Sequence, residues 1–183
     1  MEAFTHLELL KTLYRMERKL GKRLSDGQKI LLTTDGSVTR ILEILTGKPV
    51  VVETLSRKIA PADSTVARWL QVPVGRKVNY RVVKLGNPKR TRVLTIARSW
   101  IALSRLSPKV RKDLTSTDLP IGKIISKHSL EVRREILNID LAPASKELAE
   151  SFKTEVNTPL ISKTYNIIYR NNILIRINEF FQP

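Results

Sequence analysis

Three ionisable residues lie in stretches that alternate between apolar and polar side chains, as strands do: Arg81, Arg98 and Glu179. Successive side chains of a strand point to opposite faces, so the neighbours of Glu179 on its own face can be read from the sequence. They are Ile173, Ile175, Ile177 and Phe181. A carboxylate among apolar side chains is costly unless it is paired, protonated or functional. A glutamate solvated at a strand end is the alternative, and this strand alone does not decide between the two.

The two arginines also lie on apolar faces. Arg81 shares its predicted face with Val83 and Leu85. The predicted face of Arg98 carries Leu94, Ile96 and Trp100. Arginine binds a carboxylate through two parallel hydrogen bonds, and two arginines with one glutamate leave positive charge that is costly to bury without an anionic ligand. The sequence therefore favours a pocket for an organic acid over a structural ion pair between arginine and glutamate.

Six strands and several short helices position these side chains. Alternation predicts strands over residues 50–59, 78–85, 92–103, 130–141 and 160–169, and a last strand that begins near residue 172. Arg134 shares its predicted face with Leu130, Val132 and Ile136. Helical periodicity and capping residues predict helices over residues 7–20, 25–32, 38–45, 63–70, 107–114, 120–125 and 145–152. Short turns between consecutive strands favour an antiparallel sheet with helices packed on it, which is an α+β fold. A helix followed by a hairpin occurs twice, over residues 67–101 and 149–181, and indicates a faint internal repeat.

Length and composition fit one domain over residues 1–183, with 42% hydrophobic residues to form its core. No apolar run approaches the ~18 residues of a membrane helix, and the N-terminus lacks the features of a signal peptide. We therefore expect a cytoplasmic protein without a membrane partner. The chain has no cysteine, and its two histidines, His6 and His128, are far apart in sequence. These counts exclude disulfides and cysteine nucleophiles and predict no metal site.

The net charge is +16, and no acidic residue occurs between Asp63 and Asp113. Thirteen basic residues lie in that stretch: Arg68, Arg76, Lys77, Arg81, Lys84, Lys89, Arg90, Arg92, Arg98, Arg105, Lys109, Arg111 and Lys112. Such a field attracts anions, and nucleic acid is the usual first candidate. Aromatic residues for base stacking are few there, and the second helix of a candidate helix-turn-helix, residues 38–45, is mostly apolar. Nucleic acid therefore ranks below a small anionic ligand as the partner.

Five short motifs resemble, in their order, those of the chorismate pyruvate-lyase family, in particular its small archaeal-type members. They are residues 35–43, Tyr80-Arg81, Ala97-Arg98-Ser99, residues 119–122 and residues 178–183. The motifs span nearly the whole chain, and their joint order is more specific than any one of them. The segment 143–158 departs from the compact members of the family.

The resemblance implies a single domain in which helical flaps cover an internal ligand cavity on a six-stranded antiparallel sheet. It also implies cleavage of chorismate, a dianion, to 4-hydroxybenzoate and pyruvate without a cofactor. By position, Arg81 binds the ring carboxylate together with backbone N–H groups near Val38 and Ile121, Glu179 faces the ring hydroxyl, and Arg98 lies near the enolpyruvyl group. Arg81 and Glu179 are thus the expected catalytic residues, and the oligomeric state stays open.

The fold that the resemblance implies has a second branch, the effector-binding domains of bacterial transcription regulators known as UTRA domains. Those domains bind small molecules and catalyse nothing. They normally follow a DNA-binding domain, whereas the residues before the first predicted strand here match the flap sequence of the lyases. An effector-binding domain for an organic acid is the alternative function, and nucleic-acid binding ranks third.

Overall fold

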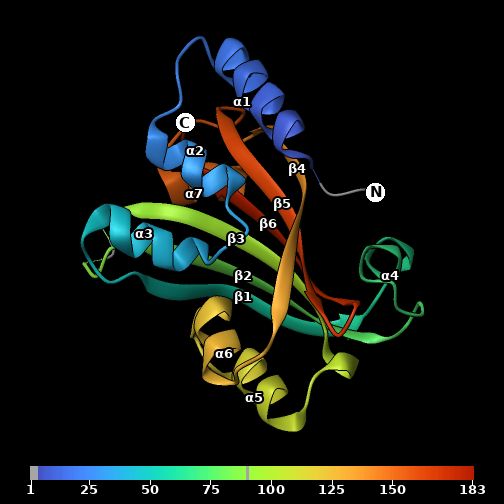
Figure 1. Cartoon of the computed structure of the whole chain (residues 1–183). Coiled ribbons are helices and arrows are strands. Elements are labelled where there is room, and N and C mark those ends of the chain that lie inside the picture. Colours follow the sequence, from blue (N-terminus) through green and yellow to red (C-terminus); the bar gives the residue numbers. More distant parts are fainter. Residues whose placement is uncertain (1–3, 90) are drawn as a thin grey trace.

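The centre of the molecule is one antiparallel sheet of six strands in the order β1-β2-β3-β6-β5-β4 (Figure 1). The computed structural model describes residues 4–89 and 91–183. Two predictions concern residues outside these ranges: the absence of a signal peptide includes residues 1–3, and the thirteen basic residues include Arg90. The strands are β1 (Val51–Pro61), β2 (Lys77–Gly86), β3 (Val93–Ala102), β4 (Val132–Pro143), β5 (Pro159–Tyr169) and β6 (Asn172–Phe181). The predicted α+β fold with six antiparallel strands is confirmed.

Short helices join and cover the strands. Within the described residues they are α1 (His6–Leu20), α2 (Asp26–Thr33), α3 (Val38–Thr46), α4 (Ser64–Leu70), the 3-10 helix η1 (Leu103–Arg105), α5 (Pro108–Ser116), α6 (Ile121–Lys127) and α7 (Lys146–Phe152). The hydroxyls of Ser25, Ser37 and Ser145 accept backbone N–H groups of α2, α3 and α7, as expected of N-caps. In the described part of the chain, no helix combines the length and the apolar character needed to cross a bilayer.

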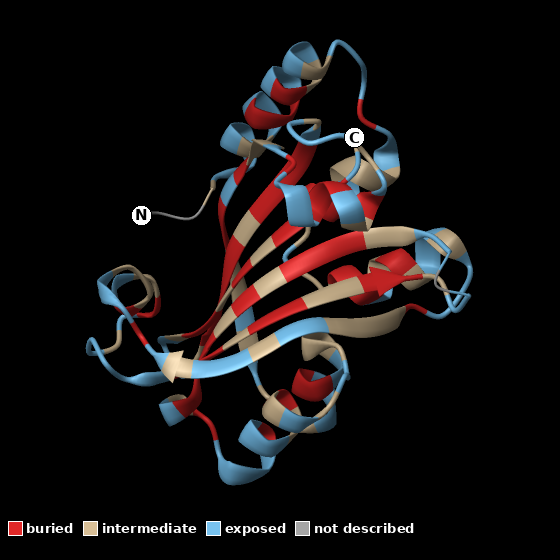
Figure 2. Cartoon of the chain, turned by 180° about the vertical axis from the view of Figure 1, so that it is seen from behind, coloured by how far each residue is buried: buried red, intermediate tan, exposed pale blue. Residues whose placement is uncertain are grey.

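Both faces of the sheet are buried, although they are covered by different helices. The inner face carries Arg81 and Glu179, and α1, α2, α3, α5 and α6 pack on it. The outer face carries Val82 and Phe180, and α4 and α7 pack on it. Figure 2 shows buried residues concentrated along the central strands, with exposed residues on the helices and on β1. Apolar side chains are therefore needed on both faces of the central strands.

The sheet consists of two halves with the same topology. The first half is β1, α4, β2 and β3, the second half is β4, α7, β5 and β6, and pairing of β3 with β6 joins them. Equivalent backbone hydrogen bonds recur in the two halves. In the first half, Ala62 N–H donates to the Arg76 carbonyl. In the second half, the residues 82 positions later form the same bond, from Ala144 N–H to the Thr158 carbonyl. The helices of the two halves also end alike, at Gln71 and Lys153 in the left-handed conformation. The predicted internal repeat is thus present in the backbone.

One face assignment on the last strand was wrong. Pairing between β5 and β6 moves from Ile167–Ile175 to Ile168–Ile173, which leaves Leu174 as an extra residue. An extra residue reverses the alternation of side chains beyond it. Ile173 consequently packs with Leu70 on the outer face, away from Glu179.

Candidate functional site

A pocket lies between the inner face and two pairs of helices, which we call the first flap (α2 and α3) and the second flap (α5 and α6). It contains about 550 Å³ of empty space, part of it continuous with solvent, and has polar and apolar walls. Its lining residues are Ser37, Val38, Thr39, Val52, Arg81, Val83, Leu85, Ala97, Ser99, Pro120, Ile121, Gly122, Arg134, Tyr165, Ile167, Ile177 and Glu179. The flaps meet above it, because a Cβ added to Gly122 would lie only 2.8 Å from the Ser37 hydroxyl oxygen. A side chain at position 122 would therefore displace the Ser37 hydroxyl that caps α3.

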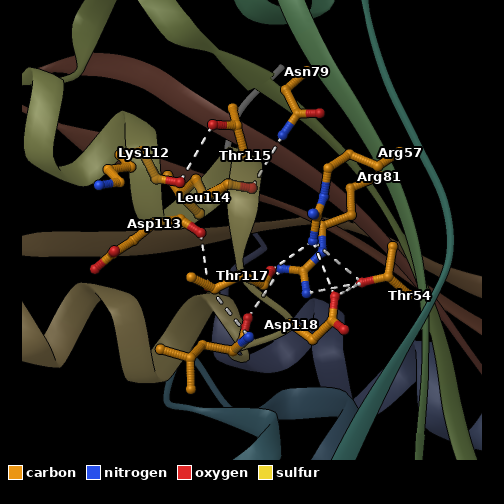
Figure 3. A network of polar contacts seen from close by, with 11 residues as sticks. Thr54, Arg57, Asn79, Arg81, Lys112, Asp113, Leu114, Thr115, Thr117 and Asp118 are labelled. Atoms are coloured by element: carbon orange, nitrogen blue, oxygen red, sulfur yellow. Dashed lines mark hydrogen bonds and ion pairs between the residues drawn. The ribbon is translucent and has the colours of Figure 1, made fainter.

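Arg81 lies in the middle of β2 and is almost fully buried, with 1% of its surface exposed. Its guanidinium donates to the Leu119 carbonyl at 3.0 Å and to the Thr54 hydroxyl at 3.3 Å (Figure 3). Burial, together with the nearby charge of Arg57, lowers the pKa of Arg81 to about 10, so Arg81 is still charged at neutral pH. Its buried Nε has no hydrogen-bond partner among the described residues. The pocket therefore contains a guanidinium with unused binding capacity.

A polar network holds the second flap against Arg81. Arg57, the register partner of Arg81 on β1, donates to the Thr117 carbonyl at 2.6 Å and forms an ion pair of 3.2 Å with Asp118. Thr54 donates to the same Asp118 carboxylate at 2.7 Å. Figure 3 shows the Arg57 and Arg81 side chains side by side, pointing toward Thr54 and Asp118. These contacts fix the segment that enters α6.

Glu179 lies on β6 and is 5% exposed. The Tyr165 hydroxyl donates to its Oε1 at 3.2 Å, and the buried Oε2 has no partner among the described residues. Burial raises the pKa of Glu179, against the lowering effects of Lys163, of the Tyr165 hydrogen bond and of Arg134. A carboxyl with a raised pKa and one free oxygen is suited to proton transfer with a bound molecule.

Lys163 is the register partner of Glu179 on β5 and was not among the site residues predicted from the sequence. It is 1% exposed, and its Nζ donates to the Leu31 carbonyl at 3.0 Å and to the Thr34 carbonyl at 2.6 Å, both in the first flap. Burial lowers the pKa of Lys163 to about 8, although Glu179 opposes the shift. Lys163 therefore joins the base of the first flap to the strand pair that carries Glu179.

The expectation that Arg98 lies in this pocket was wrong. Across the β2–β3 ladder, Arg81 pairs with Ser99, and Arg98 pairs with Val82 on the outer face. Its guanidinium forms an ion pair of 2.9 Å with Glu147 of α7 and lies 5.2 Å from the centre of the Phe180 ring. Apolar neighbours did not identify its face, because both faces of β3 are buried.

Val38 and Ile121 line the pocket at the first residues of α3 and α6, so the structure brings both of them together with Arg81 and Glu179. Arg134 also lines it and donates to the Asp35 carbonyl at 3.3 Å. Alternation in the predicted strand 130–141 put Arg134 on an apolar face. That pattern was the feature of the sequence that could have identified Arg134 as a second arginine of the pocket. Within the described residues, no three side chains of the metal-binding types gather at one place.

Comparison with known proteins gives one matching family model, described as Chorismate pyruvate-lyase Rv2949c-like, over residues 32–183. A Methanocaldococcus jannaschii protein that carries the name "Putative lyase MJ0807" is 39% identical over 174 residues, 92% of this chain and 86% of that protein. A chorismate pyruvate-lyase of Mycobacterium leprae is 25% identical over 172 residues, 93% of this chain and 80% of that protein.

Solved structures share the fold at lower sequence identity. The effector domain of PhnF from Mycobacterium smegmatis matches with a TM-score of 0.64 and 16% identity, over 80% of this chain and 88% of that domain. The structure of PhnF itself matches with a TM-score of 0.68 and 16% identity, over 82% of this chain and 65% of that chain. At this identity the match establishes a common fold alone.

Proposed function

The chain belongs to the family of Rv2949c-like chorismate pyruvate-lyases, and from this membership we propose that it cleaves chorismate to 4-hydroxybenzoate and pyruvate. The observation that carries the proposal is the pairing of two buried groups in one pocket. Among the residues that the structure describes, Arg81 has no carboxylate partner inside the pocket, and one carboxyl oxygen of Glu179 has no hydrogen-bond partner. One group suits a ligand carboxylate and the other suits a ligand hydroxyl.

The reaction needs little from a protein beyond placement and proton transfer. The ether bond between the ring and the enolpyruvyl group breaks, the ring carbon that carries the hydroxyl loses its proton, and the enolpyruvyl carbon gains one to give pyruvate. Atoms and electrons balance without a cofactor, because formation of the aromatic ring drives the cleavage. The protein supplies orientation of a dianion and a buried carboxyl group, Glu179, whose pKa is raised by burial.

The ionisable residues of the pocket have distinct roles in this proposal. Arg81 binds the ring carboxylate, helped by the first backbone N–H groups of α3 at Val38 and of α6 at Ile121. Glu179 accepts a hydrogen bond from the ring hydroxyl and takes part in proton transfer. Arg134, and not Arg98, binds the carboxylate of the enolpyruvyl group, because Arg134 lines the pocket.

Incubation of the purified protein with chorismate tests the proposal. We expect 4-hydroxybenzoate and pyruvate to form in equal amounts, measured by chromatography against a blank without protein and against Glu179→Gln. Formation no faster than in the blank would end the proposal of catalysis.

The alternative function is effector binding without turnover, and the fold shared with the PhnF effector domain favours it. Calorimetric titration with 4-hydroxybenzoate separates the two functions. Tight binding of 4-hydroxybenzoate by a protein that leaves chorismate intact supports an effector domain. Turnover of chorismate would show that the chain is not an effector domain alone.

A further inference from the structure

A second hollow lies on the outer face of the sheet, remote from the pocket between the flaps. It is a groove with about 1260 Å³ of empty space, part of it continuous with solvent, between α4 and the strands β4, β5 and β6. Arg105 fixes its wall, because the Arg105 guanidinium donates to the carbonyls of Leu70 and Gln71 in the α4 segment and to that of Ile173 in β6. Arg105 therefore joins α4 to β6 along one wall of the groove.

The floor of the groove carries three polar residues in one row across three strands. Glu135 on β4 pairs with Asn166 on β5, and Asn166 pairs with Arg176 on β6, so the three side chains point to the same face. The order across the row is an acid, a neutral amide and a base. Adjacent strands are about 4.8 Å apart, so the ends of the row are about 10 Å apart at the backbone.

Two of these residues lack partners within the described residues. Asn166 is 4% exposed, and its Oδ1 is buried without a hydrogen bond. A buried amide that has no partner reduces stability, unless a bound group satisfies it. The Arg176 guanidinium lies over the Trp69 ring at 5.0 Å and makes no hydrogen bond or ion pair to a described residue. Partial burial lowers the pKa of Arg176, and a bound anion would offset that effect.

The walls of the groove carry apolar and aromatic side chains beside polar ones, among them Arg68 and Arg133. Leu137, Ile168 and Ile173 line it together with Trp69, whose ring also contacts Trp100 edge to face at 5.1 Å. Glu135 is neutralised in part by Arg133 at the rim, at 2.7 Å. The groove thus offers a site for a carboxylate, a site for a hydrogen-bond donor and an apolar surface.

We propose that this groove binds an α-amino acid with an apolar side chain. The carboxylate binds Arg176, the ammonium donates to Asn166 and toward Glu135, and the side chain packs on Ile168, Ile173 and the Trp69 edge. The Asn166 Oδ1 is a buried atom in the structure, so binding requires the amide to turn about χ2, whose preference is broad, to bring this oxygen toward the ammonium. This site is separate from the pocket that contains Arg81 and does not depend on the proposed lyase activity.

The chain contains its own reporter for this groove. It has two tryptophans, Trp69 and Trp100, and both lie on the outer face. Tryptophan emission can be titrated with four matched compounds: phenylalanine, 3-phenyllactate, 3-phenylpropionate and phenylethylamine. The first carries both charged groups, the second has a hydroxyl in place of the ammonium, and the last two lack the donor and the carboxylate respectively.

We expect phenylalanine to change the emission and to reach saturation at or below millimolar concentration. Phenylpropionate and phenylethylamine should bind more weakly by about ten-fold or a larger factor. Equal binding of phenylpropionate would show a general anion site and overturn the proposal. No emission change with any of the four compounds would also overturn it. Better binding of phenyllactate than of phenylalanine would contradict the ammonium assignment.

Variants separate the groove from the general positive charge. Arg176→Met and Asn166→Leu should each weaken phenylalanine binding by about ten-fold, and Asn166→Leu should fold at least as well as the parent, because it removes an unsatisfied buried amide. Arg98→Met removes an arginine from the same face outside the groove and should leave binding unchanged. Sedimentation tests the competing occupant. A stable dimer that dissociates in Arg176→Met would assign the groove to a second copy of the chain and reject the amino acid.

Discussion

The two halves of the sheet have the same topology but different charges at equivalent positions. In the first half, Arg81 faces Ser99 across the β2–β3 ladder. In the second half, Lys163, 82 positions after Arg81, faces Glu179 across the β5–β6 ladder. The first half therefore buries a cation whose opposite residue is neutral, and the second half buries a cation opposite an anion.

This difference assigns different chemistry to the two halves. A buried cation without an anion attracts a ligand carboxylate, because the ligand completes the missing charge. In the second half, Lys163 and Glu179 are buried as register partners, and burial lowers the pKa of Lys163 and raises that of Glu179. The first half is suited to binding the ring carboxylate and the second to proton transfer.

Removal of the cation from the first half should have the largest effect. Arg81→Ala should weaken the binding of 4-hydroxybenzoate by ~2 to 5 kcal/mol, because a desolvated ligand carboxylate would remain unpaired. Isothermal titration calorimetry measures the change. Arg40→Ala, an exposed arginine of α3, should change binding little. Equal losses in the two variants would remove Arg81 from the carboxylate site.

The cation of the second half should appear in the pH dependence of stability. The pKa of Lys163 is lowered to about 8 from 10.5, so between these values the unfolded chain binds more protons than the folded chain. The free energy of unfolding therefore rises with pH across this window, by up to about 3 kcal/mol for a shift of this size.

Denaturant unfolding at several pH values measures this rise in the parent chain and in Lys163→Met, which should lack it. Lys146→Met, an exposed lysine of α7, is the control and should keep the rise. Glu179, Arg134, Asp35 and Tyr165 influence or contact Lys163 in both the parent and the control. The same pH dependence in Lys163→Met as in the parent would contradict the burial of a charged ammonium.

Neutralisation of the anion in the second half tests its catalytic role. Glu179→Gln should reduce chorismate turnover by roughly 10²-fold while affinity for 4-hydroxybenzoate changes less, because the amide keeps the shape and loses the titratable proton. Thermal unfolding should show unchanged or higher stability. Glu155→Gln on the surface is the matched control. A variant that melts early but keeps its activity per folded molecule would exclude Glu179 from the mechanism.

A carboxylate placed opposite Arg81 should make the first half resemble the second. Ser99→Asp puts an anion at the position that corresponds to Glu179, so Arg81 gains an internal partner and the affinity for 4-hydroxybenzoate should fall by about ten-fold or more. Calorimetry measures the change, and Ser104→Asp at an exposed position is the control. Unchanged affinity in Ser99→Asp would mean that the ligand does not depend on the unpaired charge of Arg81.

The smallest effect is expected for Arg98, which lies on the outer face of the first half. Arg98→Ala should leave 4-hydroxybenzoate affinity unchanged within about two-fold. It should lower the free energy of unfolding by less than about 1 kcal/mol, because its ion pair with Glu147 is partly exposed. Calorimetry and denaturant unfolding check both numbers. A large loss of affinity would contradict the observed strand register.

The sequence predicted the sheet and the two groups that identify the pocket. Alternation correctly placed Arg81 with Val83, and Glu179 with Ile177, because these strands have regular pairing near the site. Alternation within one strand does not relate it to its neighbour. Only the register, with Arg81 opposite Ser99, shows that Arg98 points to the other face.

Lys163 and Tyr165 show a second limit of the sequence. Both lie on β5, which forms a hairpin with β6, and their side chains share the face of Glu179. Their roles, however, depend on contacts with segments remote in sequence. Lys163 binds carbonyl oxygens of Leu31 and Thr34, more than a hundred residues earlier in the chain, and backbone carbonyls leave no mark in the sequence. The pairing of a lysine with Glu179 therefore required the structure.

The joining of the two halves by one strand pair has a consequence for synthesis. β3 pairs with β6, and a ribosome makes β6 only after the whole of β4, α7 and β5. Until then the first half carries β3 as an open edge with apolar side chains on both faces, such as Ile96 and Ile101. Open edges of this kind promote aggregation. We therefore expect nascent chains that stall between β3 and β6 to require chaperones more than chains that stall before β3.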